Sequence, residues 1–152
     1  ELKQDFAPWC STVHQLIDAA DETTCFKWAL FDRDPLPSWS KGRVTLLGDA
    51  CHPMLPFMAQ GACMAIEDAW VLATELGESD DPARAFLAYE VQRKKRTARV
   101  QMAARANAKR FHKGAPAGQL ATYGPMWLAA RIKPDLLKKP FDWIYGANVT
   151  KA

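Results

Sequence analysis

The chain has 152 residues, of which 49% are hydrophobic, and its net charge is +3. This length and hydrophobic content are enough for one globular domain with a buried core. It contains no run of about 18 apolar residues, which argues against a transmembrane helix, and its N-terminal residues are unlike a signal peptide. Its four cysteines show neither CxxC nor metal-ligand spacing, which argues against a zinc site or a disulfide framework. They indicate free thiols in a reducing, cytoplasmic compartment.

The first 41 residues predict two helices, a strand and a loop. Residues 1–20 have apolar side chains at helical spacing, and Pro8 interrupts the run. Residues 24–31 alternate, with Phe26, Trp28 and Leu30 on one side, and this period of two predicts a strand. Residues 32–41 contain two prolines and several turn-forming residues, which predicts a loop.

Residues 42–76 are the stretch around which the chain is organised. Residues 43–47 have the composition of a strand, which the dipeptide Gly48-Asp49 ends. A loop with two prolines follows, and residues 62–76 are mostly apolar, which predicts a buried helix. The predicted unit is therefore strand, acidic turn, Pro-rich loop and helix.

Such a unit suits a ligand with hydroxyl groups and negative polarisation. A carboxylate at the end of a strand, Asp49, can accept hydrogen bonds from hydroxyl groups. The free N–H groups of the first helical turn, at residues 61–63, can hold a negatively polarised oxygen. On spacing and composition alone an ordinary strand–loop–helix, with Asp49 only capping a turn, is the favoured interpretation.

A second, long helix is predicted from Pro82 to about His112, because Pro suits a first helical turn. Its apolar positions form one core stripe, which consists of Phe86, Tyr89, Val100, Ala104 and Phe111. Arg93 interrupts the stripe, so we expect it either to extend its charge to solvent or to pair with a buried acid.

The same helix carries most of the positive charge. Residues 91–113 contain nine Lys or Arg and no Asp or Glu. Because these charges spread around the helix and no aromatic stacking platform alternates with them, nucleic acid is not expected as a partner. A solvated helix face is favoured, and steering of an anionic substrate or NAD(P)H is the alternative.

The C-terminal residues predict shorter elements. Residues 114–124 are rich in Gly, Ala and Pro and predict a loose connection. Residues 125–132 predict a short apolar helix, and residues 134–145 predict a second helical piece that Pro140 interrupts. The aromatic residues near the end suggest a tail that packs back onto the core.

The string GRVTLLGDACHPMLPFMAQGACMAIEDAWVLA carries a resemblance to a known family. It resembles the second FAD-binding motif of the flavin-dependent aromatic hydroxylases, in particular of their salicylate hydroxylase and 6-hydroxynicotinate 3-monooxygenase branch. KWALFDRDPLPSWSKGRVTLLGD, FLAYEVQRKKRTARVQ and FDWIYGANV are similar to the segments that lead into it, follow it and end the chain. GxGxxG, the family's N-terminal motif, does not occur, so the resemblance covers a C-terminal portion only: a fragment, a split gene product or a truncated relative.

The resemblance implies the fold class and the domain organisation. The class is α/β, as an α+β fragment: the C-terminal part of a Rossmann-like FAD-binding fold with a mostly helical C-terminal half. Residues 1–41 would supply helices and a strand of the substrate-side layer. Residues 42–152 would form part of the FAD-binding domain, and the GxGxxG segment would come from the same gene or a separate chain.

The resemblance also assigns cofactor contacts. Asp49 matches the aspartate that bonds the ribityl chain of FAD. Gly61, Ala62 and Cys63 match positions whose backbone N–H groups approach N1 and O2 of the flavin, an edge that becomes negative on reduction. Pro53 belongs to the loop beside the isoalloxazine ring.

Two residues are assigned to catalysis, and no metal site is expected. Pro56 matches a position close to where the substrate meets the flavin. His52 is interpreted as a polar group near the reacting edge, which can hold a phenol or carboxylate or relay a proton, or else as a loop histidine bonded to backbone. Gln60 is a further polar neighbour, and Cys51 and Cys63 are expected to be small buried fillers.

The implied activity is aromatic monooxygenation with FAD, O₂ and NAD(P)H, through a flavin hydroperoxide, on an acid such as a hydroxybenzoate. The protein itself would supply position, electrostatics and exclusion of water. Another flavoenzyme (an epoxidase, halogenase or reductase) is one alternative, and a non-catalytic remnant or interaction module that cannot hold FAD alone is another. Nucleic acid and membrane are not expected as partners, and a homodimer is left open.

Overall fold

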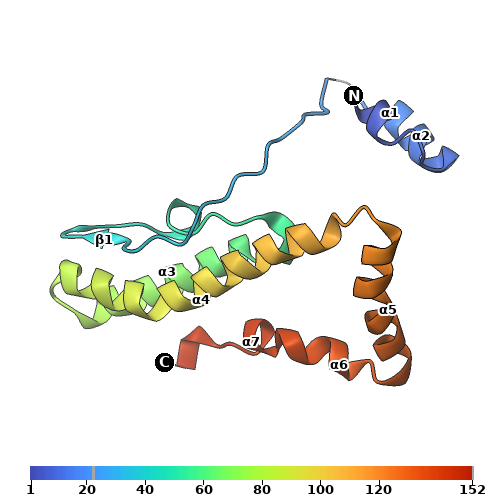
Figure 1. Ribbon diagram of the computed structural model, residues 1–152. Coiled ribbons are helices and arrows are strands. Elements are labelled where there is room, and N and C mark those ends of the chain that lie inside the picture. The colour runs from blue at the N-terminus through green and yellow to red at the C-terminus, as the bar shows by residue number, and fades with distance from the viewer. Residues whose placement is uncertain (22, 152) are drawn as a thin grey trace. The chain divides into compact units, whose positions relative to one another are not determined.

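The computed structural model describes residues 1–21 and 23–151, and this part of the chain is mostly helical (Figure 1). It divides into two compact units, residues 1–30 and residues 31–152, and the assignment of residues 1–41 to a substrate-side layer stays a prediction. Among the described helices, none combines the length and the apolar composition needed to cross a membrane.

The N-terminal unit contains α1 (Leu2–Asp5) and α2 (Ser11–Asp18), which confirms two helices broken around Pro8. The predicted strand over residues 24–31 is wrong, because the structure has extended chain there without ladder pairing. Phe26 and Trp28 are 68% and 80% exposed. Alternation makes a strand only where a neighbouring strand offers backbone partners, and the described part of this unit has none.

The second unit begins with an irregular segment and a small hairpin. β1 (Ser40–Lys41) pairs antiparallel with β2 (Val44–Thr45), and Gly42 occupies the turn with a φ of 58°. The predicted strand over residues 43–47 is therefore much shorter than expected. Within the described residues this hairpin is the whole sheet, so the predicted α/β character is reduced to two antiparallel strands on helices.

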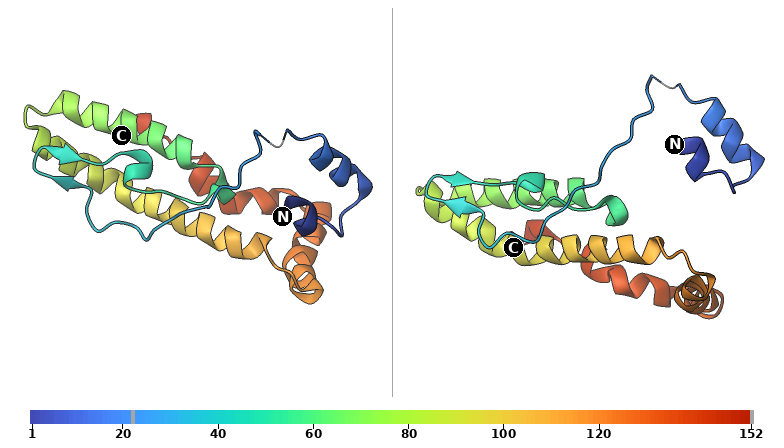
Figure 2. Two further views of the ribbon diagram at one scale, coloured as in Figure 1. Left: turned by 90° about the horizontal axis from the view of Figure 1, so that it is seen from above. Right: turned by 45° about the horizontal axis from the view of Figure 1, so that its top comes forward.

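Two long helices form the body of this unit. The chain passes through the 3₁₀ turns η1 (Gly48–Ala50) and η2 (Pro56–Met58) into α3 (Gly61–Glu78), and α4 (Pro82–Phe111) follows. Figure 2 shows α3 and α4 side by side with the hairpin and the loop lying across them. Trp39, Cys51, Val71 and Tyr89 form the apolar core at this junction.

Both helices were predicted closely, but their buried faces are narrower and more polar than expected. On α3 the buried residues are Met64, Asp68 and Val71, whereas Ile66 and Trp70 are 70% and 53% exposed. A helix that is buried all round was therefore the wrong expectation for the described structure.

On α4 the predicted stripe is confirmed at Tyr89, Val100 and Ala104, while Phe111 is half exposed. The same face buries five polar or charged side chains, those of Glu90, Arg93, Thr97, Gln101 and Asn107. Buried polar groups need partners, and these side chains find them mainly in α3 and in the irregular segments before it.

The C-terminal tail consists of α5 (Pro116–Ile132), α6 (Asp135–Lys138), η3 (Lys139–Phe141), α7 (Asp142–Tyr145) and η4 (Val149–Lys151). The loose connection predicted for residues 114–124 is wrong, because Pro116 starts a helix that continues through Pro125. The predicted return of the tail to the core is confirmed: Arg96 donates to the carbonyl oxygens of Trp143 (2.8 Å) and Ile144 (3.0 Å).

Candidate functional site

The turn that carries Asp49 lies against α3. Gly48 is buried with a φ of 59°, and a Cβ added there would lie 3.2 Å from Cβ of Ala65. Glycine is therefore needed both for the left-handed backbone and for the close approach of the turn to the helix. Asp49 follows directly and is exposed, and no bond to another described residue is found for its carboxylate.

The N-terminus of α3 is open beside this carboxylate. A Cβ added to Gly61 would lie 3.9 Å from Oδ1 of Asp49 and 3.9 Å from Cγ of Met54. Gln60 makes no side-chain cap, so the N–H groups of residues 61–63 have no intrahelical partner. The structure thus brings Asp49 and the first turn of α3 together. An acceptor beside several free donors can bind a ligand that carries hydroxyl groups and a negatively polarised edge.

Two of the predicted minor roles at this site need correction or qualification. Cys63 is exposed in the first turn of α3, so the expectation of a buried filler is wrong there, whereas Cys51 is fully buried as expected. All four cysteines are free thiols, as predicted. Gln60 is 8% exposed and precedes the helix.

The Pro-rich loop is hydrogen-bonded to α4 at Pro53 and at Phe57, while Pro56 between them is exposed to solvent. Pro53 is half-buried, and its carbonyl oxygen accepts a hydrogen bond from Nε2 of Gln101 at 3.0 Å. Pro56 is exposed at the start of η2, where its fixed φ suits the turn. Asn107 donates to the carbonyl oxygen of Phe57 at 3.2 Å. Helix α4 therefore positions this loop through side-chain amides that the sequence pattern did not reveal.

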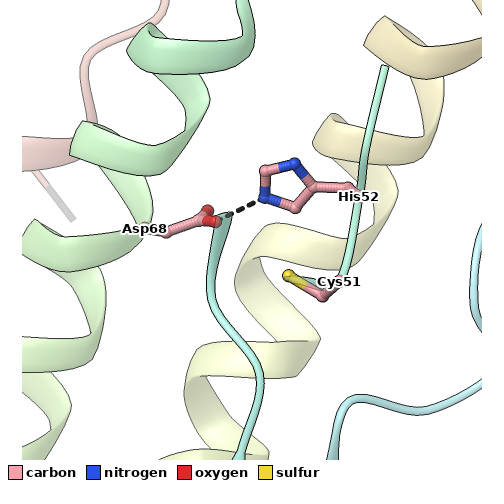
Figure 3. A group of neighbouring side chains, drawn as sticks. All are labelled: Cys51, His52 and Asp68. Carbon is pink, nitrogen blue, oxygen red and sulfur yellow. Dashed lines mark hydrogen bonds and ion pairs between the residues drawn. The ribbon is translucent and has the colours of Figure 1, made fainter. Parts of the chain in front are cut away.

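His52 is buried beneath the loop instead of facing outward. Its side chain is 1% exposed, and its Nε2 lies 2.5 Å from Oδ2 of Asp68 (Figure 3). Burial alone would lower the pKa of His52, but the hydrogen bond to Asp68 outweighs it and, with a smaller contribution from Cys51, raises the pKa from 6.5 to about 9. The side chain is therefore an imidazolium paired with a carboxylate, which neither sequence interpretation anticipated.

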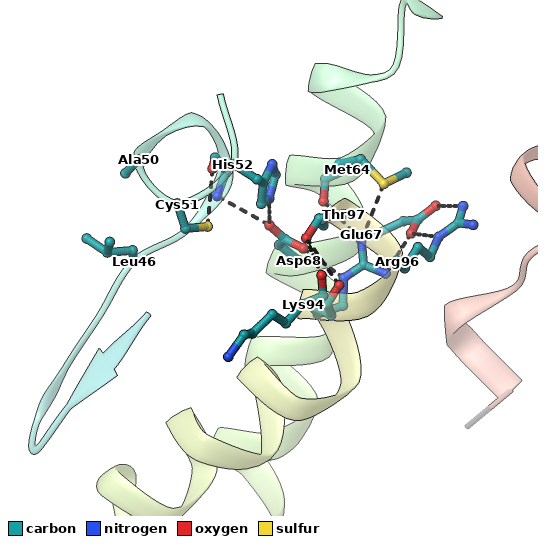
Figure 4. Close-up of polar contacts among 12 residues, drawn as sticks. Leu46, Ala50, Cys51, His52, Met64, Glu67, Asp68, Lys94, Arg96 and Thr97 are labelled. Atoms are coloured by element: carbon teal, nitrogen blue, oxygen red, sulfur yellow. Dashed lines mark hydrogen bonds and ion pairs between the residues drawn. The ribbon is translucent and has the colours of Figure 1, made fainter. Parts of the chain in front are cut away.

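Asp68 is the centre of a buried charge network (Figure 4). Its Oδ2 also accepts the backbone N–H of Gly48 at 3.3 Å, and its Oδ1 accepts Nε of Arg93 at 2.7 Å. Burial raises the pKa of Asp68, but the hydrogen bonds and positive charges of His52 and Arg93 outweigh it and hold the pKa below 3.8. Arg93 also pairs with Glu67 at 2.7 Å, and Glu67 receives two hydrogen bonds of 2.8 Å from Arg96.

One sequence signal did point to this network. Arg93 interrupts an apolar stripe, and of its two predicted fates the structure confirms pairing with a buried acid. The identity of that acid was missed, because Asp68 resembles any charged position on a helix until α3 and α4 are packed together.

The network also contains a cluster with metal-ligand chemistry. The donor atoms of Cys51, His52 and Asp68 lie within 4.8 Å of one another and are buried. However, both oxygens of Asp68 are used by cationic groups, and Sγ of Cys51 donates to the carbonyl oxygen of Gly48 at 3.2 Å. The donor set is therefore engaged in ion pairing, and we assign no metal to it.

Part of the positive charge of α4 is paired with acidic side chains. Arg93 pairs with both Glu67 and Asp68, and Arg96 pairs with Glu67. Lys94 pairs with Glu90, and Arg105 pairs with Asp32 and Asp34. In addition, Arg99 stacks over the ring of Trp143 at 3.8 Å. The predicted solvated face therefore accounts for only some of these basic residues. The paired ones connect other segments of the chain to the helix.

The sequence of this chain is similar to those of known proteins that bind FAD. The profile of the family described as "FAD binding domain" matches residues 19–104, more than half of the chain. This chain belongs to the FAD-binding domain family. Within that family it is 51% identical over 151 residues to the 6-hydroxynicotinate 3-monooxygenase of Bordetella bronchiseptica. The alignment covers 98% of this chain and 32% of that protein, so the chain spans less than half of the relative's length.

Solved structures of FAD-binding relatives are similar to this chain. HpxO of Klebsiella pneumoniae, complexed with FAD and uric acid, matches with a TM-score of 0.75 and 35% identity, covering 82% of this chain and 32% of that one. A salicylate hydroxylase substrate complex matches with a TM-score of 0.65 and 33% identity, covering 82% and 29%. The predicted resemblance to the aromatic hydroxylases is thus confirmed. The part of their structure that this chain matches is mostly helical.

Proposed function

We propose that this chain is the flavin-holding portion of an FAD-dependent monooxygenase that hydroxylates an aromatic acid. The observation that carries the proposal is the exposed carboxylate of Asp49 beside the open N-terminus of α3. Membership of the FAD-binding domain family and 51% identity to a 6-hydroxynicotinate 3-monooxygenase support it. The complete fold would be Rossmann-like, with the GxGxxG segment supplied by residues outside this sequence.

The residues at this site fit FAD. When bound, FAD would supply the redox chemistry and the transfer of oxygen from O₂, with NAD(P)H as the reductant. Asp49 accepts hydrogen bonds from the ribityl hydroxyl groups, since its carboxylate is exposed and unpaired among the described residues. The N–H groups of Gly61, Ala62 and Cys63 hold the negatively polarised edge of the flavin at the positive end of the α3 dipole.

The Pro-rich loop gives the site its shape. Pro53 is anchored through its carbonyl oxygen to α4, and Pro56 stands exposed at the start of η2, where it can border the reacting edge of the flavin. Prolines stiffen a loop at low entropic cost, so this border is ordered before any ligand arrives. His52 supports the loop from beneath through its bond to Asp68. Its side chain is 1% exposed, so we do not expect the imidazole to contact a substrate.

The substrate class follows from the named relatives. 6-Hydroxynicotinate and salicylate are hydroxylated aromatic carboxylic acids, and the proteins named for them are similar to this chain. We therefore propose an aromatic acid as substrate, hydroxylated with or without loss of its carboxylate. The free thiols, three of them exposed, support a reducing cytoplasmic location.

The first test is FAD retention by the full-length protein and by its Asp49→Ala variant. Loss of a charge-assisted hydrogen bond costs about 1.5–3 kcal/mol, so the variant should bind FAD roughly 10- to 150-fold more weakly. Flavin absorbance after desalting and titration of flavin fluorescence measure this. Asp80→Ala, at an exposed acid between α3 and α4, is the matched control and should retain FAD normally.

The outcomes separate the three candidate functions. FAD retention with NAD(P)H oxidation stimulated by 6-hydroxynicotinate, 3-hydroxybenzoate or salicylate supports the hydroxylase. FAD retention without stimulation by any aromatic acid favours another flavoenzyme. A full-length protein that does not retain FAD would be the non-catalytic remnant, and unchanged affinity in Asp49→Ala would remove the role given to that residue.

A further inference from the structure

Asp49 sits between two anchoring points that share one acceptor atom. Oδ2 of Asp68 accepts the backbone N–H of Gly48 at 3.3 Å and lies 2.5 Å from Nε2 of His52. Gly48 is the residue before Asp49, and His52 follows three residues after it. The turn that presents Asp49 is therefore fastened on both sides to a single side chain of α3.

The second oxygen of Asp68 ties the same turn to α4. Oδ1 accepts Nε of Arg93 at 2.7 Å, and the guanidinium of Arg93 also reaches the carbonyl oxygen of Met64 at 3.4 Å. Met64 follows the three residues whose N–H groups open the N-terminus of α3. One carboxylate and its arginine thus connect the Asp49 turn with the start of α3.

Burial makes these connections stiff. Asp68, Arg93 and His52 are 0%, 2% and 1% exposed, so water does not compete for their bonds. By contrast, no bond to another described residue is found for the side chain of Asp49, and its place relative to α3 is set by the backbone of its turn. A preorganised carboxylate binds a ligand better than a mobile one, because less freedom is lost on binding.

We infer that Asp68 is the positioning residue of the FAD site: through Gly48, His52 and Arg93 it sets the carboxylate of Asp49 against the amide groups of α3. Asp68 is not a cofactor ligand itself, since it is fully buried. The inference rests on the proposed function, specifically on contact between Asp49 and FAD. It predicts that Asp68 affects FAD affinity only through Asp49.

A double-mutant cycle in the full-length protein tests this coupling. Dissociation constants for FAD are measured by fluorescence titration for the wild type, Asp68→Asn, Asp49→Ala and the double variant. Asp68→Asn should weaken binding about tenfold when Asp49 is present and less than about twofold when Asp49 is alanine. Equal weakening in both backgrounds, or none in either, would overturn the inference.

Glu90→Gln is the matched control. Glu90 is also a buried carboxylate, 7% exposed, and it accepts the backbone N–H groups of Trp39 and Ser40 at 2.9 Å each, so these bonds go to the hairpin segment and not to residues 48–52. Its removal should lower stability yet leave the affinity for FAD within about twofold of the wild type. Comparable loss of affinity in Glu90→Gln would mean that any damage to the fold suffices, and would overturn a specific role for Asp68.

A milder variant covers the case in which Asp68→Asn does not fold. His52→Gln removes one of the two anchors and leaves the bond from Gly48, so we expect FAD to bind about threefold more weakly and again only when Asp49 is present. An Asp49→Ala variant with normal affinity would remove the contact between Asp49 and FAD from the proposed function, and this inference with it. A normal effect of Asp49→Ala together with silent Asp68 and His52 variants would sink the inference alone.

Discussion

At Asp68, three donors from three segments converge on one buried carboxylate. Each carboxylate of this network has two cationic partners, because Asp68 pairs with His52 and Arg93, and Glu67 pairs with Arg93 and Arg96. Removing one partner of such a buried pair leaves an uncompensated charge and typically costs about 3–5 kcal/mol. The residue-scale consequence is that buried ion pairs hold the loop before α3 in addition to the apolar packing of Cys51.

The His52–Asp68 pair gives stability a defined pH dependence. The pKa of His52 is raised from 6.5 to about 9, so its contribution is complete below about pH 6.5 and is lost as the pH rises through 9. Asp68 has the opposite sign, because its pKa is lowered below 3.8 and its contribution is lost as the pH falls further. Stability should therefore decline on both sides of a broad plateau.

Urea unfolding at about pH 6 and about pH 10 measures the alkaline decline, which the His52 shift sets at roughly 3 kcal/mol. His52→Gln should be less stable at the lower pH and should lose little between the two conditions. If wild type and His52→Gln lose the same amount between these pH values, another group is responsible.

At the scale of elements, α4 acts as a support for the irregular segments before α3. Tyr89 donates to the carbonyl oxygen of Leu46 at 3.2 Å, Gln101 to that of Pro53, and Asn107 to that of Phe57. Irregular segments have few backbone partners of their own, so the side chains of one regular helix supply them. Helix α4 thereby sets the course of the residues that carry Asp49, Pro53 and Pro56.

Gln101→Ala should loosen the Pro-rich loop without unfolding the helix. The lost hydrogen bond costs about 1 kcal/mol, and amide hydrogen exchange in peptides that span residues 51–58 should become faster. Met102→Ala is the control, because this neighbour on α4 is 48% exposed. Unchanged exchange in Gln101→Ala would show that the loop is held by other contacts.

At the scale of the whole unit formed by residues 31–152, one chain of charged contacts runs from the Asp49 turn to the C-terminal tail. Asp68 binds Arg93, Arg93 binds Glu67, and Glu67 binds Arg96. Arg96 then holds two carbonyl oxygens of the tail, next to the buried Ile144. The tail is therefore fixed by polar bonds as much as by its aromatic residues.

Arg96→Ala should release this tail from α4. Hydrogen bonds that involve a charged group contribute about 1.5–3 kcal/mol each, so their loss should expose the bond after Lys138 to trypsin, whereas Lys133 and Lys139 precede proline and are not cut. Limited proteolysis followed by mass spectrometry detects this cleavage. Lys95→Ala, an exposed neighbour on α4, should be cut at the wild-type rate, and an equally resistant Arg96→Ala would contradict the role given to Arg96.

Much of the local structure was determined by the sequence itself. The helices at residues 2–5, 11–18, 61–78 and 82–111 follow from periodicity, Pro positions and caps, all of which act over a few residues. The placement of Asp49 before an open helix N-terminus was also predicted, because glycines and prolines punctuate that stretch. The family could also be predicted from the sequence, because its motif is one contiguous stretch.

Tertiary structure alone decided which groups became partners. Residues 24–31 alternate like a strand, but a strand depends on a neighbour that the described chain does not offer. His52 looked like a loop histidine, and its burial against Asp68 depends on how α3 and α4 pack. Burial and pairing join residues that lie far apart in the sequence, so local patterns predict the elements while packing assigns the charges.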